Sequence, residues 1–473
     1  MKLLPLLLLT ITCLLTTCQQ TTADNQSPTA ALTTPNLIII LADDLGYGDL
    51  GCYGSPRIRT PHLDRMAAEG LKLTSFYAFP SCSPSRAALL TGCYPPRVGV
   101  PDVVGPPGPA WTQQRQYGLN PAETTLAEVL KAKGYATGMV GKWHLGHWPE
   151  TMPLAQGFDR YYGLPYSNDM LPPEYPDLPL YDDTTVVELN PDQALLTGRY
   201  TDQSLQFIRE HRDTNFFLYL AHSMPHVPLF VGEAYADGSG QGLYADVVEE
   251  LDGSVGTILR ELETLGIDDN TLVVFTSDNG PWLTYGDHAG SAGPFREGKG
   301  TTLEGGMRVP TIVRWPARVP AGRTTHAVMG LQDLLPTIAS LTEAELPSLP
   351  LDGYDRSEFL FGAAGTDPEV DERPFFFYRS GLVDAVRRGR WKYHLDHQFR
   401  TVRQVGNESA RGEYDYRELP AALYDVVGDP GERYDRAAEY PELVVELREL
   451  AEREQARMDS VRRPPFRPEE INF

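Results

Sequence analysis

Residues 36–44 read NLIIILADD, and this stretch decides the fold that we expect. The apolar run from Leu37 to Ala42 has no polar face. Such a run is typical of a strand that is covered on both sides, as in a parallel sheet. The stretch therefore predicts a buried strand with Asp43 and Asp44 at its carboxyl end.

The same pattern recurs further along the chain. Apolar runs lie within 134–146, 215–226 and 270–280, and their polar ends carry Lys142 and His144, His222 and His226, and Asp278 and Asn279. Amphipathic helices expected at 60–71, 123–134 and 244–266 alternate with these runs. This alternation predicts a mainly parallel sheet between two layers of helices. Because ligands bind beyond the carboxyl ends of such strands, the polar ends predict one shared site.

Beyond about residue 369 the chain changes to short strand-like pieces separated by turns, within 373–381, 385–396 and 422–435. An amphipathic helix is expected over 440–458. We therefore expect two domains, a large α/β domain over 35–368 and a small antiparallel sheet with a packed helix over 369–473.

The first residues are expected to direct export. Residues 1–18, MKLLPLLLLTITCLLTTC, contain an apolar run that is too short for a membrane-spanning helix. Leu15 to Cys18 resembles a bacterial lipobox, which would attach a lipid anchor to Cys18, although Thr17 is larger than the residue usual there. We expect 1–24 to be an export signal and 25–34 a flexible tether, and we place the mature protein in a bacterial periplasm or on the cell surface.

The charge balance limits the partners of the chain. Its 41 basic and 64 acidic residues give a net charge of −23. This excludes nucleic acid as a partner, because phosphate binding needs a basic face. The same charge opposes long-range capture of an anionic polymer. An anionic substrate must therefore be held by a local basic pocket.

Oxygen-bearing side chains end two of the expected strands. Asp43 and Asp44 end the first, and Asp278 and Asn279 end the last. This set of donors suits a hard cation such as Ca²⁺ or Mg²⁺ better than zinc, and the chain has no C-x-x-C pair for a structural zinc site. The alternative is that these residues only form turns and caps.

Cys82 stands just before an expected helix, in CSPSRAALLTG at 82–92. Its thiol could be a nucleophile, a metal ligand, half of a disulfide or a buried structural group. A cysteine phosphatase has an arginine six residues after its cysteine. Here Arg86 comes four residues later and Ala88 takes the sixth place, which excludes that class. A cysteine hydrolase would gain little from a hard cation.

The stretch CSPSRAALLTG resembles the signature of the type I sulfatases, Cys-x-Pro-Ser-Arg followed by Leu-Thr-Gly. Other motifs of that family follow the same order: LADDLGYGDLGCYG (41–54), GKWHLG (141–146), TSDNG (276–280), GKGTTLEGGMRVP (298–310) and LYDVVGDPGE (423–432). The resemblance is greatest to the arylsulfatase A and N-acetylgalactosamine-6-sulfatase branch. It implies an alkaline-phosphatase-like fold, with a mixed, mainly parallel sheet between helices. It also implies hydrolysis of sulfate esters of a sugar or an aryl alcohol.

In that family the signature cysteine is converted to formylglycine, so the resemblance implies that a formylglycine-generating enzyme matures Cys82. One oxygen of the hydrated aldehyde would attack sulfur, and loss of a proton from the other would expel sulfate. By position, Asp43, Asp44, Asp278 and Asn279 match the ligands of a Ca²⁺ ion, with Mg²⁺ as the alternative. Residue 82 would complete the metal shell.

The resemblance also implies roles for the basic residues around Cys82. Arg86 would steady residue 82, and Lys142 and Lys299 would grip the sulfate group. His144 would hydrogen-bond the hydrated aldehyde and act as the base in the elimination.

A second histidine and a serine have implied roles at the substrate. His226 would protonate the leaving oxygen. His222 is its rival, but His226 stands two residues before Pro228, as the family histidine does. Ser167, in LPYSND, matches a serine that contacts sulfate.

The sequence does not select the substrate. Segments 101–120 and 169–196 are rich in Pro, Asp and Gly, and we expect them to be long loops over the site. Trp282, His288 and Arg296 are candidates for sugar contacts, with ordinary loop residues as the alternative.

One departure concerns the cysteines. Cys93 stands where most relatives carry arginine, and in an oxidising compartment Cys52 and Cys93 could pair.

Two functions remain as alternatives to a sulfatase. One is a phosphomonoester or phosphodiester hydrolase of the same superfamily, and the other is a non-catalytic, glycan-binding lipoprotein. All positions that match the family motifs are intact, which favours a sulfatase over these alternatives. The sequence does not predict an oligomeric state.

Overall fold

The computed structural model describes residues 34–106, 116–362, 373–407 and 410–468. The expected export signal and nearly all of the tether lie outside these ranges. No helix within the described ranges is long and apolar enough to cross a membrane.

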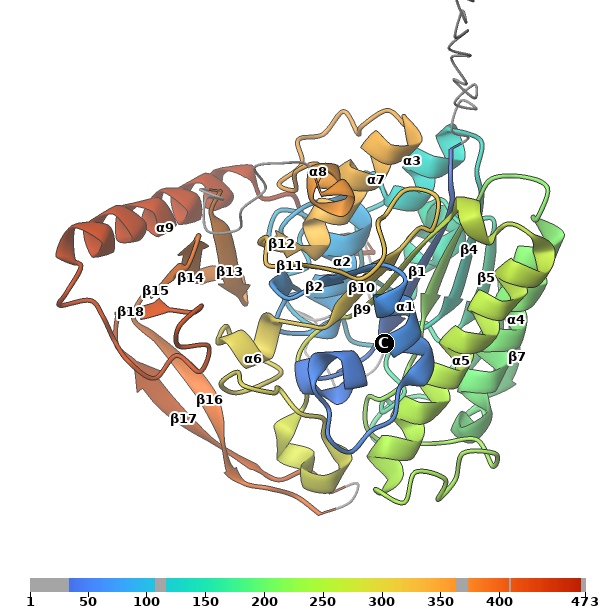
Figure 1. Cartoon of the computed structure of the whole chain (residues 1–473), viewed down its shortest axis with the longest axis horizontal. Coiled ribbons are helices and arrows are strands. Elements are labelled where there is room, and N and C mark those ends of the chain that lie inside the picture. Colours follow the sequence, from blue (N-terminus) through green and yellow to red (C-terminus); the bar gives the residue numbers. More distant parts are fainter. Residues whose placement is uncertain (1–33, 107–115, 363–372, 408–409, 469–473) are drawn as a thin grey trace, which may run out of the picture. The chain divides into compact units, whose positions relative to one another are not determined.

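A ten-stranded mixed sheet forms the centre of the fold, in the order β11-β2-β10-β9-β1-β8-β4-β5-β6-β7 (Figure 1). Its strands are β1 (Asn36–Ala42), β2 (Leu71–Leu73), β4 (Ala136–Gly141), β5 (Arg160–Gly163), β6 (Pro179–Asp182), β7 (Thr185–Leu189), β8 (Phe216–Ala221), β9 (Thr271–Ser277), β10 (Thr311–Arg314) and β11 (Arg323–Thr325). The five strands from β9 to β5 pair in parallel, whereas β10, β6 and β7 pair antiparallel with their neighbours. This confirms the expected mixed, mainly parallel sheet.

Helices cover both faces of the sheet. They are α1 (Pro61–Ala68), α2 (Cys82–Thr91), α3 (Leu126–Ala132), α4 (Leu196–Glu210), α5 (Leu243–Leu265), α6 (Glu304–Met307), α7 (Leu334–Thr342) and α8 (Ser357–Phe361). The helices expected at 60–71, 123–134 and 244–266 are α1, α3 and α5, so all three are confirmed.

The central strand β1 shows how the two layers form. Successive side chains of a strand point to opposite faces. Leu37, Ile39 and Leu41 therefore join one core cluster with residues of α2, α3 and α7. Ile38 and Ile40 join the other cluster, with residues of α1, α4 and α5. Because both faces are buried, the strand needs the continuous apolar run that its sequence has.

The segment 169–196 differs from the loop that we expected. Strands β6 and β7 form an antiparallel hairpin within it and extend the edge of the large sheet. The expectation of a long structureless loop is therefore wrong for 179–189. The alternation of apolar and polar residues that indicates a strand extends over only a few residues here, so the sequence does not predict the hairpin. Of the other expected loop, 107–115 lies outside the described residues.

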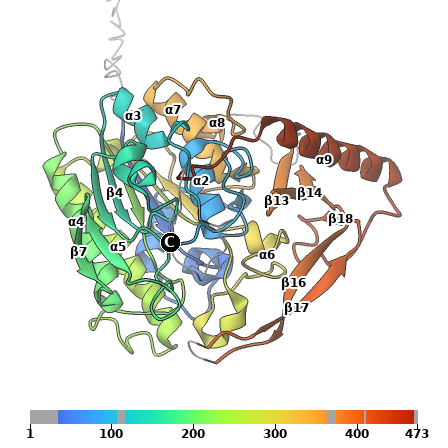
Figure 2. The same cartoon turned by 180° about the vertical axis from the view of Figure 1, so that it is seen from behind.

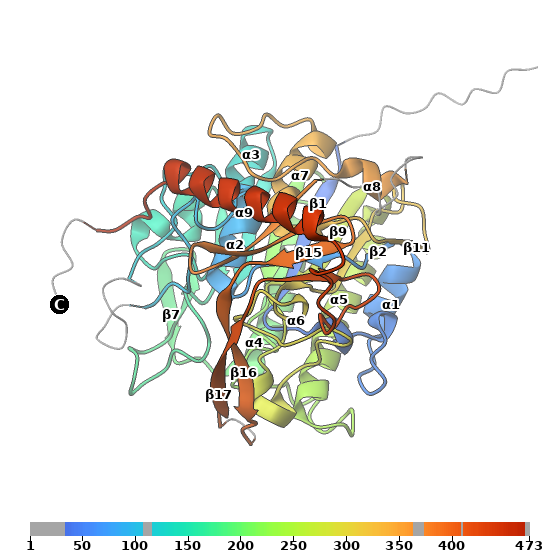
Figure 3. The ribbon, with the colours of Figure 1, turned by 90° about the vertical axis from the view of Figure 1, so that its left-hand side faces the viewer.

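The C-terminal part contains a four-stranded antiparallel sheet, β13 (Phe375–Arg379), β14 (Leu382–Arg388), β15 (Trp391–His394) and β18 (Ala422–Asp425). Helix α9 (Pro441–Val461) packs against β14 and β15 (Figure 3). This confirms the expected small sheet with a helix. Its core is continuous with that of the large sheet, because Phe375 and Tyr393 belong to the same cluster as Phe79 and Tyr94. The described residues from Thr34 onward form one compact unit.

A separate hairpin projects from this part of the chain. It consists of β16 (His397–Gln404) and β17 (Glu413–Leu419), which pair antiparallel. The hairpin contacts the short 3₁₀ segment η8 (Leu283–His288), which follows β9 (Figure 2). Two further short strands, β3 (Phe76–Tyr77) and β12 (Met329–Gly330), pair in parallel.

Candidate active site

Two neighbouring strands bring the acidic residues together. β1 and β9 run in parallel with Ala42 opposite Ser277, so the residues that follow each strand emerge side by side. The backbone N–H of Asp44 donates to Oδ1 of Asp278 at 3.1 Å. Asp43, Asp44, Asp278 and Asn279 are all buried.

Asn279 presents an oxygen that has no partner. Its Nδ2 donates to Oδ1 of Asp44 at 2.6 Å, which fixes the orientation of the amide. Its Oδ1 is buried without a hydrogen-bond partner among the described residues. Asp44 also has a positive φ of 67°, which turns the chain sharply at the strand end. A cation held by carboxylates would satisfy an oxygen in this position.

Cys82 is the first residue of helix α2. Its Sγ lies 3.4 Å from Oδ1 of Asp43 and 3.5 Å from Nζ of Lys299. Ligand atoms of Asp43, Asp44, Cys82 and His226 all lie within 4.8 Å of one another. The helix N-terminus directs backbone N–H groups toward this point and favours an anion there.

Arg86 binds two of the acidic residues at once. It is one helical turn after Cys82 and therefore on the same face of α2. Its guanidinium donates to Oδ2 of Asp278 at 2.8 Å and to Oδ2 of Asp43 at 3.2 Å, and it also donates to the carbonyl of Lys142. Arg86 is fully buried, so this network holds the carboxylates in fixed positions.

The end of β4 supplies the next pair. Gly141 has a φ of 105°, and a Cβ there would lie 1.9 Å from the carbonyl oxygen of Ala221, so only glycine allows β4 to approach β8 before the chain turns. Lys142 follows and forms a buried ion pair with Asp43. Its Nζ also donates to Oγ of Ser167 at 3.0 Å.

A second lysine approaches from the other side of Cys82. Nζ of Lys299 lies 2.8 Å from Oδ1 of Asp44 and 4.4 Å from the ring centroid of Trp282. Burial alone would lower the pKa of Lys299, but Asp44 raises it above its ordinary value, so the side chain is charged.

Hydrogen bonds to carbonyl groups fix the tautomers of two histidines. A carbonyl can only accept, so the 3.0 Å contact of His144 with Val104 O places a proton on Nε2. Nδ1 of His144 has no partner among the described residues and can accept a proton. The 2.6 Å contact of His226 with Val227 O places a proton on Nδ1, while its Nε2 lies 3.7 Å from Oδ2 of Asp44. Burial lowers the pKa of both, and Lys142 for His144 and Lys299 for His226 lower it further.

His222 is separated from this group. Its Nε2 lies 3.4 Å from Oγ of Ser254, on helix α5, and it does not line the cavity that contains Cys82. His226 does line that cavity. The geometry therefore favours His226 over His222 as the residue that meets a substrate.

The electrostatics suit a bound cation and oppose a free thiolate. Burial and the charge of Asp43 raise the pKa of the Cys82 thiol well above its ordinary value, so an unmodified thiol would be a poor nucleophile. Burial raises the pKa of Asp278 to about 6, and repulsion by Asp43 contributes. For Asp43 burial is outweighed by Lys142, His226 and Arg86, which hold its pKa below the ordinary value.

The cavity above Cys82 has a volume of about 690 Å³. Six of the residues that the sequence predicts at the site line this cavity: Cys82, His144, Ser167, His226, Trp282 and Lys299. The C-terminal part supplies further lining residues that were not expected: Arg379, Ser380, Gln398, Arg400, Arg411 and Tyr416. These residues follow Cys82 by about 300 positions and form no motif, so the sequence gives no signal for them.

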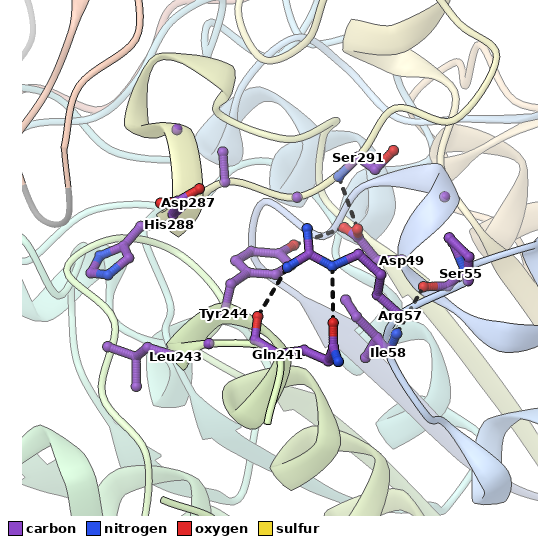
Figure 4. Close-up of a pocket in the computed structure, with 17 residues that line it drawn as sticks. Asp49, Ser55, Arg57, Ile58, Gln241, Leu243, Tyr244, Asp287, His288 and Ser291 are labelled. Carbon is purple, nitrogen blue, oxygen red and sulfur yellow. Dashed lines mark hydrogen bonds between the residues drawn. The ribbon is translucent and has the colours of Figure 1, made fainter. Parts of the chain in front are cut away.

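A second cavity, of about 630 Å³, is lined in part by η8, and Figure 4 shows its lining. It contains Asp49, Arg57, Tyr244 and His288. His288 therefore lines a different cavity from that of Cys82. Arg296 is also elsewhere: its guanidinium packs over the Phe399 ring and donates to Glu432 O. Of the three candidates for sugar contacts, Trp282 alone lines the cavity above Cys82.

The cysteines outside the expected leader are all free thiols. Cys52 lies beside Asp64, whose Oδ1 accepts from its backbone N–H at 2.7 Å. Cys93 contacts Arg463 and Pro350 O. The disulfide considered between Cys52 and Cys93 is therefore not formed.

Comparisons with known proteins agree with this geometry. Residues 35–344 match the model of the family described as Sulfatase, and residues 370–464 match the C-terminal region of aryl-sulfatase. Human arylsulfatase A is 41% identical over 454 residues, covering 88% of this chain and 87% of the relative. Pig N-acetylgalactosamine-6-sulfatase is 39% identical over 455 residues, covering 89% of this chain and 85% of the relative. A solved Bacteroides thetaiotaomicron sulfatase, described in terms of glycosaminoglycan metabolism, has a TM-score of 0.76 and 29% identity, and the match covers 90% of this chain and 100% of that one. The chain therefore belongs to the sulfatase family and is a sulfuric ester hydrolase.

Proposed function

We propose that this enzyme hydrolyses the sulfate ester of a sugar or an aryl alcohol through a formylglycine made from Cys82, next to a divalent cation. One observation carries the proposal. Cys82, three carboxylates and two lysines meet in one buried cluster at the floor of a cavity large enough for a saccharide unit. The family membership supports the same reaction.

Asp43, Asp44, Asp278 and Asn279 would hold the cation. The fit rests on the unpartnered Oδ1 of Asn279 and on the pKa of Asp278, which burial raises and repulsion by Asp43 raises further. Oxygen donors of this kind favour Ca²⁺, with Mg²⁺ as the alternative. When bound, such a cation supplies positive charge that stabilises an attacking oxygen and the anionic ester.

Residue 82 would act in its hydrated aldehyde form. One of its oxygens would attack sulfur, and the alcohol would leave from the opposite side. The remaining hydroxyl would then lose its proton, which expels sulfate and restores the aldehyde. The high pKa of the Cys82 thiol supports a need for the modification, because a thiol that stays protonated cannot attack.

The two histidines would move the protons. Nδ1 of His144 is neutral and unpartnered, and it would take the proton of the remaining hydroxyl. His226 would give a proton from Nε2 to the leaving oxygen. Because Val227 O holds its Nδ1–H, this step needs the doubly protonated ring, which the Asp44 carboxylate 3.7 Å from Nε2 favours. Lys299 and Ser167 line the cavity and would bind the sulfate oxygens. Lys142 donates to Oγ of Ser167 and would bind the sulfate group from that position. Arg86 would hold residue 82 and the carboxylates in place.

Co-expression with a formylglycine-generating enzyme tests the modification. The peptide that contains residue 82 should react with a hydrazide, and the matured enzyme should release sulfate from an aryl sulfate. The same preparation should act much more slowly on the matching aryl phosphate, which separates a sulfatase from a phosphohydrolase. Full activity in a protein whose residue 82 is entirely an unmodified thiol would contradict the proposal.

Metal analysis tests the cation site independently of turnover. Asp278→Ala should lower the content of Ca²⁺ or Mg²⁺ in purified protein, because it removes one carboxylate of the set. Asp287→Ala, an exposed acid of η8, serves as the matched control and should keep the metal. Asn279→Ala removes an uncharged ligand and provides a second variant if Asp278→Ala does not fold. Unchanged metal content in both site variants would contradict the assignment.

We also propose that the enzyme is exported, with residues 1–24 as its signal, and that 369–473 acts as its C-terminal domain. Peptide analysis of the mature N-terminus, including Cys18, would show whether the chain begins after a signal and whether it carries a lipid.

A further inference from the structure

The β16–β17 hairpin forms one wall of the cavity above Cys82. Gln398 and Arg400 of β16 and Tyr416 of β17 line the cavity, as does Arg411, which precedes β17. The hairpin is far from Cys82 in sequence, and none of these residues belongs to the reacting cluster. They are therefore candidates for contact with the part of the substrate that is not cleaved.

Arg400 is fixed against the lysine of the catalytic cluster. Its Nε donates to the backbone carbonyl of Lys299 at 3.0 Å, and Nη2 donates to the same oxygen. Gly300 leaves room for it, because its φ is +84° and a Cβ there would lie 2.2 Å from Nη2 of Arg400. The guanidinium is therefore held against the backbone of Lys299, and both residues line the same cavity.

Arg411 adds a second positive charge next to Arg400. The guanidinium carbon of Arg411 lies 5.4 Å from the ring centroid of Tyr414, and that of Arg400 lies 4.4 Å from the same centroid. Arg411 also lies 5.7 Å from the ring centroid of Trp282, which packs on Lys299. Three cations therefore share two aromatic rings along one wall.

Neither arginine has a carboxylate partner within 4.0 Å among the described residues, although the chain has 64 acidic residues. The neighbouring arginines of this part are paired: Arg379 with Asp384, Arg403 with Glu413 and Arg417 with Asp415. Burial lowers the pKa of Arg400, and the charge of Arg411 adds to this effect. The two charges repel each other, and an anion bound beside them would relieve that repulsion.

Acidic residues also line the cavity. They are Asp102, Asp169 and Glu174, and Oδ1 of Asp169 is buried without a partner among the described residues. Carboxylates there would repel an anion but could accept hydrogen bonds from sugar hydroxyl groups. The cavity therefore offers both hydrogen-bond acceptors for hydroxyl groups and, at the hairpin, two arginines without a carboxylate partner.

We propose that Arg400 and Arg411 form a second anion subsite, so that the preferred substrate is a saccharide with another anionic group beside the scissile sulfate ester. This inference rests on the proposed function. The shared chemistry is a planar or tetrahedral oxyanion, either the carboxylate of a uronic acid or a second sulfate, and a guanidinium fork suits both. An unsubstituted aryl sulfate lacks such a group and uses only the cluster around Cys82.

The test compares three disaccharides that carry the same scissile sulfate. The neighbouring sugar is neutral in the first, a uronic acid in the second and sulfated in the third. Matured wild-type enzyme should hydrolyse at least one of the dianionic substrates with a kcat/KM about tenfold above that of the neutral one, as expected for hydrogen bonds to a charged group. The substrate that gains shows which oxyanion the subsite takes.

Variants of Arg411 connect this preference to the hairpin. Arg411→Gln should reduce the dianionic-to-neutral ratio of kcat/KM to near one, Arg411→Glu should invert the ratio, and Arg411→Lys should keep part of it. Arg417→Gln is the matched control, because Arg417 lies on the same hairpin, is exposed and does not line the cavity. Arg400→Gln should give the same loss and, because Arg400 holds Lys299 O, a further loss on all substrates. Thermal unfolding verifies that each variant is folded.

The outcomes separate the two proposals. If the wild-type enzyme releases sulfate from an aryl sulfate but shows no preference among the disaccharides, the subsite is wrong and the proposed function stands. A preference that Arg411→Gln and Arg411→Glu leave unchanged also overturns the subsite. Failure to release sulfate from any substrate, by an enzyme shown to carry formylglycine, overturns the proposed function itself.

Discussion

At the scale of single residues, we expect the position of charge in the cavity to separate the groups that would bind sulfate from the group that would serve the leaving alcohol. Lys299 contacts Sγ of Cys82 and the carboxylate of Asp44, so it would meet every sulfate ester alike. His226 is held by Val227 O at Nδ1 and presents Nε2 to the cavity. A proton on Nε2 matters only when the leaving oxygen is a poor leaving group.

This difference predicts distinct substrate profiles for two variants. His226→Ala should reduce turnover of a sugar sulfate by about 100-fold or more, which is typical for loss of an acid catalyst, and should harm an activated aryl sulfate much less. Lys299→Ala should reduce both alike. Steady-state kinetics of both variants on one substrate of each kind provide the measurement. Equal losses for His226→Ala would remove its role as general acid, and His222→Ala would then be the next variant.

Asp49 illustrates a second effect at this scale, in the cavity that Figure 4 shows. Its carboxyl group accepts from the N–H of Gly46 and the hydroxyl of Tyr244, both at 2.7 Å, and from the N–H of Ser291 at 2.8 Å. Burial outweighs these three bonds and raises the pKa of Asp49 to about 7 from 3.8. The folded protein therefore keeps a proton that the unfolded chain releases near pH 4.

The sign of the resulting pH dependence follows from linkage. A raised carboxyl pKa stabilises the folded state below about pH 4, and this contribution is lost as the pH rises to about 7. The Tm of the wild type minus the Tm of Asp49→Asn should therefore fall from pH 5 to pH 8, because only the wild type has the titrating carboxyl group. Tyr244→Phe removes a bond that lowers the pKa of Asp49 in the folded state, so the decline should begin at the same pH and continue to higher pH. A difference that stays constant across this range would show that Asp49 does not titrate there.

At the scale of elements, buried charges join the small sheet to the segment that carries Lys299. Nζ of Lys392, on β15, lies 3.0 Å from Oε1 of Glu304 on α6 and 2.9 Å from Oε1 of Glu432. It also donates to the carbonyl of Thr302 at 2.9 Å. All three charged side chains are fully buried. Loss of the lysine would therefore remove the positive charge that both buried carboxylates share.

Lys392→Met should therefore destabilise the protein by about 3 kcal/mol, which is typical of breaking a buried charge pair from one side. It should also lower turnover, because Thr302 follows the Lys299–Gly300 turn closely. Thermal or denaturant unfolding measures the first effect and aryl sulfate kinetics the second. Arg453→Met is the control, since Arg453 forms an exposed pair with Glu449 on α9 and should change stability by less than about 1 kcal/mol. Similar losses in the two variants would contradict a special role for the buried group.

The elements also show how far a sequence can predict this fold. The apolar run of β1 and the capped helices α3 and α5 carry local signals, and the structure has each where it was expected. The β6–β7 hairpin has no such signal, because its strands are short and their exposed side chains include Val186 and Leu189. The cluster around Cys82 could be anticipated because each residue lies in a short motif at a strand or helix end. Arg400 and Arg411 could not, since only the tertiary packing of the hairpin brings them to the cavity.

At the scale of the whole molecule, the large and small sheets share one core. Phe375 and Tyr393 of the small sheet belong to the same apolar cluster as Phe79 and Tyr94 of the large part. Phe79 lies close before α2, which carries Cys82, so this shared core also supports the cluster around Cys82. Separation of the two sheets would expose a large apolar surface on both, which costs free energy in water.

The last prediction follows from that shared core. The matured protein should unfold in one cooperative transition, with calorimetric and van't Hoff enthalpies that agree, because neither sheet can lose its packing alone. A chain that ends at residue 368 should be insoluble or should lack a cooperative transition, since it would expose the apolar residues that contact Phe375 and Tyr393. It would also lose the hydrogen bonds from Arg400 that hold Lys299 O. The truncated chain should therefore be compared with and without the C-terminal part added as a separate chain. Differential scanning calorimetry of the full chain provides the measurement. Two separate transitions, or a stable and active chain that ends at 368, would show that the two sheets are independent domains despite their common core.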